Sequence, residues 1–249
     1  GRSYALGDLA VAYRVNAQSR ALEDACLRYG IPYQVVGGLK FYLRQEVKDL
    51  TAYLRLVANP DDDVSLTRVI NVPSRGIGQR TLDELTRIAR DAGSSMFSAI
   101  EGLARSREQG RQDASPFAPR SAQALVDFQD LIKGLAPEGQ APDLVELIDL
   151  VLERTGYKRH VLEEAERGEE RWENIQEFRN TARDYLDLGG RDALTAFLES
   201  VSLVSDTDNL DEEVDALTLI TLHQAKGLEF PVVFMVGMEE GILPHIRSM

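Results

Sequence analysis

Hydrophobic and polar positions follow two different patterns along this chain. Short, continuous apolar runs lie at residues 8–14 and 33–36 near one end, and at residues 216–222 and 231–235 near the other. Such runs are typical of buried parallel strands. Residues 18–29 carry apolar side chains at helical spacing between the first two runs, so the beginning of the chain predicts a strand–helix–strand unit.

The middle of the chain has helical periodicity almost throughout. Apolar stripes at a spacing of three and four residues predict helices in five segments: residues 43–57, 82–88, 144–152, 172–185 and 194–201. A Thr81-x-x-Glu84 pattern predicts a capping box at the start of the second helix. The polar stretches at residues 105–120 and 134–143 are rich in Ser, Pro, Gly and Gln and predict loops.

Helices bracketed by strands at both ends indicate an insertion. The sequence therefore predicts an α/β fold, in which the two chain ends form part of a parallel sheet and a large all-helical domain is inserted between them. We expect the sheet domain to contain residues 1–41 and 213–249, and the helical domain to contain residues 42–212.

The charge balance argues against a free-standing nucleic-acid-binding protein, which is usually basic. Lys and Arg number 28 against 41 Asp and Glu, which gives a net charge of −13. Any contact with DNA must therefore be local, made by a few cations and backbone amides. The single cysteine, Cys26, and three scattered histidines indicate neither a disulfide framework nor a metal cluster.

The ends of the chain and its longest apolar runs bear on whether it is a fragment and where it is located. The chain starts at Gly1 without a methionine and stops at Met249 soon after a predicted strand, so we expect it to be part of a longer protein. No apolar run is long enough to span a bilayer, and no signal peptide opens the chain. We expect a cytoplasmic, monomeric fragment without membrane contact.

Residues 221–230, TLHQAKGLEF, carry the densest candidate chemistry. This segment lies between two predicted strands, at the carboxyl edge where parallel sheets bind ligands. A hydroxyl, an imidazole, a lysine, a glycine and a carboxylate within nine residues could hold phosphate and ribose together. The alternative is a polar connection in which Lys226 and Glu229 are simply solvated.

A second candidate is the Arg75-Gly76-Ile77-Gly78 sequence, followed by Arg80 and Thr81. Two glycines around one apolar anchor predict a tight hairpin at a helix N-terminus. Open backbone amides there would cradle a phosphate without net positive charge. The alternative is an ordinary turn between two helices.

Three segments resemble superfamily 1 DNA helicases of the UvrD/PcrA/Rep family. The stretch TLHQAKGLEFPVVFMVGMEEGILPH resembles motif V of these enzymes and the strand after it. The stretch AVAYRVNAQSRALEDACLRYGIPYQVVGGLKFYLRQEVKD resembles their passage from the second RecA-like domain into its inserted helical domain, and RVINVPSRGIGQRTLDEL resembles the GIG element of that insertion. The segments occur in family order, so the resemblance implies a partial second RecA-like domain with its insertion.

The resemblance also implies roles for individual residues. It marks as contacts to single-stranded DNA Arg14, Asn16, Lys40, Thr221 and His223. It implies that Glu229 accepts from the ribose hydroxyls of the nucleotide and that Gly227 lets the backbone approach. The hairpin is implied to grip duplex DNA ahead of the fork, through Arg75, Gly76, Ile77, Gly78 and Thr81.

The resemblance implies an ATP-dependent 3′–5′ helicase as the parent, with ATP and Mg²⁺ as cofactors. The chain holds no Gly-x-x-x-x-Gly-Lys-Ser/Thr loop, so we expect the fragment alone to bind neither cofactor and to be inactive. Expected partners are single-stranded DNA, a duplex junction, and repair or replication proteins. Two alternatives remain open at this point: a non-catalytic DNA- or protein-binding module of helicase ancestry, and the helicase part of a recombination helicase–nuclease.

Overall fold

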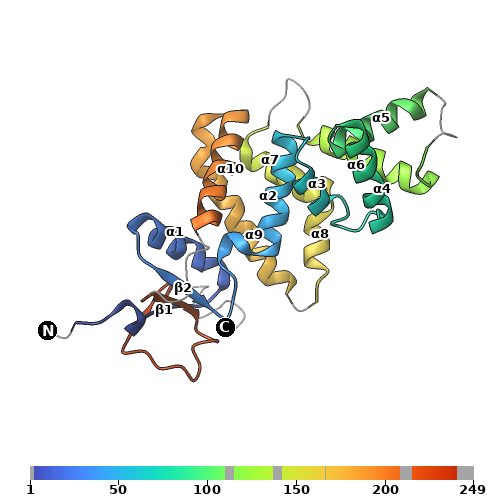
Figure 1. Cartoon of the computed structure of the whole chain (residues 1–249). Helices are drawn as coiled ribbons and strands as arrows, with labels where there is room; N and C mark the ends of the chain where they lie inside the picture. The colour runs from blue at the N-terminus through green and yellow to red at the C-terminus, as the bar shows by residue number, and fades with distance from the viewer. Residues whose placement is uncertain (1–2, 110–114, 137–141, 166, 208–214, 240–249) are drawn as a thin grey trace. The chain divides into compact units, whose positions relative to one another are not determined.

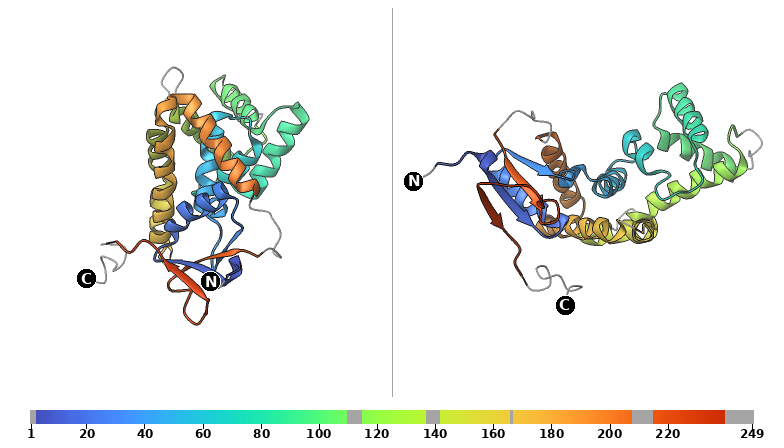
Figure 2. Two further views of the ribbon diagram at one scale, coloured as in Figure 1. Left: turned by 90° about the vertical axis from the view of Figure 1, so that its left-hand side faces the viewer. Right: turned by 90° about the horizontal axis from the view of Figure 1, so that it is seen from below.

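The two ends of the chain form one parallel sheet. The computed structural model describes residues 3–109, 115–136, 142–165, 167–207 and 215–239. The strands are β1 (Leu9–Tyr13), β2 (Tyr33–Val36), β3 (Leu217–Thr221) and β4 (Val232–Met235), in the spatial order β2-β3-β1-β4. Figure 2 shows the blue strands of the N-terminal segment beside the orange and red strands of the C-terminal segment. The predicted α/β fold, with one sheet drawn from both ends, is confirmed.

The chain divides into two compact units (Figure 1). The sheet unit contains residues 1–47, 166–178 and 200–249, and the helical unit contains residues 48–165 and 179–199. These units are defined by packing, so each contains several separate segments of the chain. The prediction that residues 42–212 form one inserted domain concerns a continuous segment, and it stays a prediction.

The sheet buries side chains on both faces. Ala10, Ala12 and Ile220 pack on one face with Phe230 from the connection after β3. On the opposite face Val11, Tyr13 and Leu219 pack with Leu22 of α1 (Ser19–Tyr29). This alternation follows from the two-residue period of a strand.

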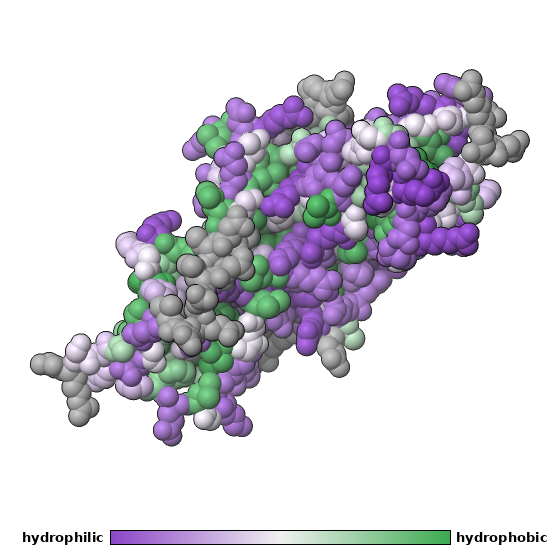
Figure 3. Space-filling model, in the orientation of Figure 1, coloured by the Kyte–Doolittle hydropathy of each residue, from purple (hydrophilic) through white to green (hydrophobic). Residues whose placement is uncertain are grey.

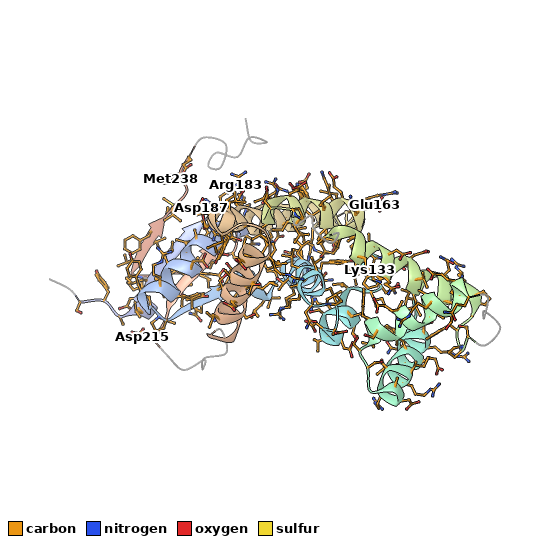
Figure 4. All side chains as sticks on the ribbon, turned by 90° about the horizontal axis from the view of Figure 1, so that it is seen from above. Lys133, Glu163, Arg183, Asp187, Asp215 and Met238 are labelled. Carbon is orange, nitrogen blue, oxygen red and sulfur yellow. The ribbon has the colours of Figure 1, made fainter. Side chains whose placement is uncertain are left out.

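One edge strand of the sheet unit exposes apolar side chains. Figure 3 shows hydrophobic residues at the surface of this unit. The edge strand β4 has three apolar residues that are each about half exposed, Val233, Phe234 and Met235. On the N-terminal side, Asp215 (labelled in Figure 4) accepts hydrogen bonds from the amides of Leu6 and Gly7, at 3.0 and 2.6 Å. This carboxylate therefore has a structural role, although it ends an acidic run whose residues 208–214 lie outside the described part.

Helices and their connections make up the remainder of the described chain. After α1 they are α2 (Gln45–Ala58), α3 (Asp63–Val69), α4 (Gln79–Ala92), α5 (Met96–Glu108), α6 (Pro119–Leu135), α7 (Leu144–Arg154), α8 (Tyr157–Leu162), α9 (Gly168–Thr181) and α10 (Gly190–Thr207). Within the helical unit, α4 packs on α5, α5 on α6, α6 on α7, and α7 on α8. None of the helices in the described ranges is long and apolar enough to cross a membrane.

The predicted loop at residues 105–120 is wrong at both ends. Helix α5 continues to Glu108, with Arg105 and Arg107 in its last turn, where cations complement the helix dipole. Helix α6 begins at Pro119, a residue suited to the first helical position. Residues 110–114 lie outside the described part of the chain.

The predicted capping box at Thr81 is also wrong. Helix α4 begins at Gln79 and its N-cap is Gly78, in an extended conformation. The Gly78 carbonyl accepts from the amides of Thr81 and Leu82, at 3.0 and 3.2 Å, so Thr81 lies inside the first turn. The sequence pattern placed the start of the helix three residues too late.

Candidate nucleic-acid and nucleotide site

The carboxyl ends of β1 and β3 bring two predicted DNA contacts together. The strands pair with Tyr13 opposite Thr221, so both end at the same level of the sheet. The Arg14 guanidinium then donates from Nη1 to the His223 imidazole, 2.7 Å from Nδ1 and 3.0 Å from Nε2. Arginine can only donate and a neutral imidazole has one accepting nitrogen, so only one of these two contacts can be a hydrogen bond. A cation and a directed polar ring thus share one edge of the sheet.

The turn after β1 is held by Gln18, which the sequence analysis did not single out. Its Oε1 accepts from the backbone amides of Arg14 and Val15, at 3.0 and 3.1 Å. The next predicted contact, Asn16, is half-buried, and its Nδ2 donates to the carboxylate of Glu170 on α9. Gln18 therefore fixes the backbone from which Arg14 and Asn16 project.

The turn after β3 is held by Gln224 in a similar way. Its Oε1 accepts from the Thr221 hydroxyl at 2.9 Å, and its Nε2 donates to the Gly37 carbonyl at 2.7 Å. The Thr221 side chain is only 6% exposed and is committed to this turn. Thr221 therefore shapes the loop from inside. His223, two residues later, is exposed.

Arg44 anchors the back of the same turn. Its guanidinium donates to the Asn16 carbonyl at 3.0 Å, the Ser19 hydroxyl at 2.7 Å and the Asn174 Oδ1 at 2.7 Å. Burial lowers the pKa of Arg44, and the nearby Glu23 carboxylate opposes that shift. The buried cation thereby ties the strand end to α1 and α9.

Lys40 lies beside Tyr33, which starts β2 and pairs with Leu217, four residues before the end of β3. Lys40 is half-buried, and its ammonium lies over the Tyr33 ring, 4.9 Å from the centroid. Burial raises the pKa of Tyr13 to about 12, so this phenol at the end of β1 stays neutral. Arg14, which follows Tyr13, therefore projects from an uncharged strand end.

The predicted nucleotide contacts lie farther along the connection between β3 and β4. Gly227 has a φ of +90°, a conformation that favours glycine, and a β-carbon there would meet nothing within 4 Å. Glu229, two residues later, is exposed. An open backbone beside an exposed carboxylate has the chemistry to accept two ribose hydroxyl donors.

The predicted duplex contact is a separate site in the helical unit. Gly76 has a φ of +76°, and the Ile77 side chain is 1% exposed, so any DNA contact at Ile77 is limited to its backbone. The amides of Arg75 and Ile77 donate to the Asn71 Oδ1, at 2.7 and 3.2 Å. Within the described part of the chain, no hydrogen-bond partner is present for the amides of Gly76, Gly78, Gln79 and Arg80. The open amides therefore alternate with the two that Asn71 holds.

The whole chain, residues 1–249, matches the family described as the UvrD-like helicase C-terminal domain. The chain belongs to this helicase family. The predicted resemblance is thereby confirmed.

The similar proteins are much longer than this helicase chain. It is 41% identical to the ATP-dependent DNA helicase PcrA of Bacillus subtilis, over 98% of the chain and 33% of that protein. It is 42% identical to PcrA of Staphylococcus aureus strain Mu50, over 97% of the chain and 32% of the relative. The chain thus spans about a third of the length of the relatives that it matches.

Gly37 offers a test of the turn that positions His223. Its φ is +77°, and a β-carbon there would overlap the Gln224 carboxamide, whereas at Gly30, with a φ of +64°, a β-carbon meets nothing within 4 Å. We expect Gly30→Ala to lower the free energy of unfolding by about 1 kcal/mol through backbone strain alone. Gly37→Ala should lower it by about 2–3 kcal/mol, because overlap adds to strain. Urea unfolding measures both, and equal losses in the two variants would show that Gln224 does not hold this turn.

Proposed function

We propose that this chain is part of an ATP-dependent DNA helicase that moves 3′ to 5′ on single-stranded DNA and unwinds duplex DNA in repair or replication. Family membership and the PcrA relatives support the proposal. In the parent, the sheet unit would form half of the single-strand track and one wall of the ATP cleft. Residues 42–212 would act as the inserted domain that meets the duplex.

The observation that carries the proposal is the meeting of Arg14 with His223. These residues are 209 positions apart in the sequence, yet the pairing of β1 with β3 places their side chains within hydrogen-bond distance at one sheet edge. A guanidinium and an imidazole, with Asn16 and Lys40 as further candidates, offer charge and directed donors to a phosphate backbone. None of these groups selects a base sequence there, which suits a motor that must move along any strand.

The nucleotide role is assigned to Gly227 and Glu229, on the same connection as His223. A charged carboxylate that accepts ribose hydroxyls makes charge-assisted hydrogen bonds. The phosphate-binding loop and the magnesium ligands belong to other parts of the parent, which would supply the phosphoryl-transfer chemistry. The residues of this chain would orient the nucleotide and connect it to the DNA track.

The duplex role is assigned to the hairpin of Gly76, Ile77 and Gly78 and to the first turn of α4, which contains Thr81. The unpartnered amides of this segment point to a phosphate, because a helix N-terminus attracts anions through its partial positive charge. Such a contact requires no excess of lysine or arginine, which agrees with the net charge of −13.

The division of labour within residues 221–230 is testable in the intact parent enzyme. Glu229→Gln keeps the size of the side chain and removes its charge, so we expect about tenfold weaker ATP turnover with single-strand affinity nearly unchanged. His223→Ala should weaken single-strand binding by about tenfold, and lower ATP turnover chiefly at subsaturating DNA. Turnover is measured at saturating DNA and DNA affinity at saturating nucleotide. Proportional loss of both activities in both variants would mean that the loop is only a scaffold.

The hairpin assignment is testable at Gly78. Its φ is −85°, and a β-carbon there meets nothing within 4 Å, so Gly78→Ala leaves the fold intact and places a methyl group where the phosphate would approach. We expect about tenfold weaker duplex binding at low salt, as for the loss of one hydrogen bond to a charged group. Gly102→Ala on α5, another position with nothing within 4 Å, is the matched control. Unchanged duplex affinity in Gly78→Ala would leave the hairpin as an ordinary turn.

A further inference from the structure

We propose that Arg75 is a positioning residue that clasps the duplex-binding hairpin from inside, and that it does not itself contact DNA phosphate. This inference rests on the proposed duplex role of Gly76–Arg80. It replaces the direct contact that the sequence assigned to Arg75, because its side chain is engaged within the protein.

The Arg75 guanidinium is surrounded by backbone carbonyl groups. Nη1 donates to three of them, the carbonyls of Val69, Ile70 and Pro73, at 3.1, 3.2 and 3.1 Å. Nη2 donates to the Tyr53 hydroxyl at 2.8 Å and to the Thr155 carbonyl at 3.2 Å. The four N–H groups of Nη1 and Nη2 are thus shared among five acceptors, which a planar fork can reach and a single ammonium cannot.

The positive charge is balanced by helix ends and aromatic rings. Val69 is the last residue of α3 and Thr155 is the C-cap of α7, so the cation faces the negative ends of two helix dipoles. Its central carbon also lies 5.4 Å from the centroid of the Phe128 ring and 6.0 Å from that of Tyr53. No ion pair to a carboxylate holds Arg75 in the described part of the chain.

The clasp acts on the hairpin through the backbone. The side chain of Arg75 points into the unit, while its own amide and that of Ile77 donate to Asn71. The two inward attachments and the buried Ile77 side chain fix the segment on one side. The amides of Gly76, Gly78, Gln79 and Arg80 are left open, which is the arrangement that a phosphate cradle requires.

Substitution by lysine separates the two possible roles of Arg75. Lysine keeps the charge but loses the planar fork. A clasp predicts that Arg75→Lys weakens duplex binding by about tenfold, while the slope of log affinity against log salt stays unchanged because no phosphate contact is lost. The exposed Arg80 is the charge control: Arg80→Gln should reduce that slope by about 0.9, the value for one phosphate contact. Arg90→Gln, at the far end of α4, should leave both quantities unchanged.

The opposite pattern would overturn the proposal. If Arg75→Lys binds duplex DNA like the unmodified chain and Arg75→Gln lowers the salt slope by about 0.9, Arg75 is a phosphate contact. Normal duplex binding in Gly78→Ala would instead mean that the proposed duplex function fails. The clasp is then judged without DNA, by faster hydrogen exchange of the Ile77 amide in Arg75→Lys; unchanged exchange overturns it.

A measurement on the unmodified chain covers the case in which the Arg75 variants fail to fold. Side-chain NMR of arginine reports hindered rotation of a caged guanidinium. We expect separate, DNA-insensitive Nη signals for Arg75, and DNA-dependent shifts for Arg80. A shift of the Arg75 signals as large as that of Arg80 would show a direct contact and overturn the clasp.

Discussion

The parallel pairing of β1 with β3 is the interaction on which the rest of the site depends. Its register, with Tyr13 opposite Thr221, makes two strands from distant parts of the chain end at the same level. Arg14 and His223 then meet as a consequence of where the strands stop. A slip of one residue would turn every side chain of the shifted strand to the other face of the sheet. The buried packing on both faces excludes such a slip, so the core of the sheet determines the geometry of the candidate track.

The negative net charge of the chain is compatible with DNA binding because several carboxylates are engaged inside the protein and do not face the proposed DNA contacts. Several carboxylates are occupied inside the sheet unit: Glu23 accepts from the Phe41 amide at 2.9 Å, and Glu46 accepts from Asn174 at 2.6 Å and pairs with Arg171 at 3.2 Å. The surfaces proposed to contact DNA carry a few local cations and uncharged backbone amides instead. Net charge describes the field far from the molecule, whereas a phosphate at contact distance responds to the nearest donors.

Regular elements with long apolar patterns were predictable from the sequence, and side-chain networks were not. The four strands were predicted within about one residue, because each is a short run of mostly apolar side chains between polar segments. Helices α3, α5, α6 and α8 were not predicted: α3 and α8 are too brief to show a period, whereas α6 carries a buried apolar stripe that could have been read from the sequence. The first turn of α4 was misplaced because Gly78 acts as the N-cap in place of Thr81. Gln18, Gln224 and Arg44 connect segments that meet only in the folded chain. The same holds for Arg75: the sequence shows that it is charged, but not that its guanidinium donates to backbone carbonyls inside the protein.

The central claim is that the ends of β1 and β3 form one surface for single-stranded DNA. The most direct test is backbone NMR of this chain during titration with a short oligothymidine strand at low salt. The account predicts that the amide signals of Arg14, Val15 and Asn16 shift together with those of Leu222 and His223, with the same apparent affinity. It also predicts that raising the salt concentration reverses the shifts, because phosphate contacts depend on released counterions. Shifts confined to one of the two strand ends, or different affinities at the two, would contradict a single track.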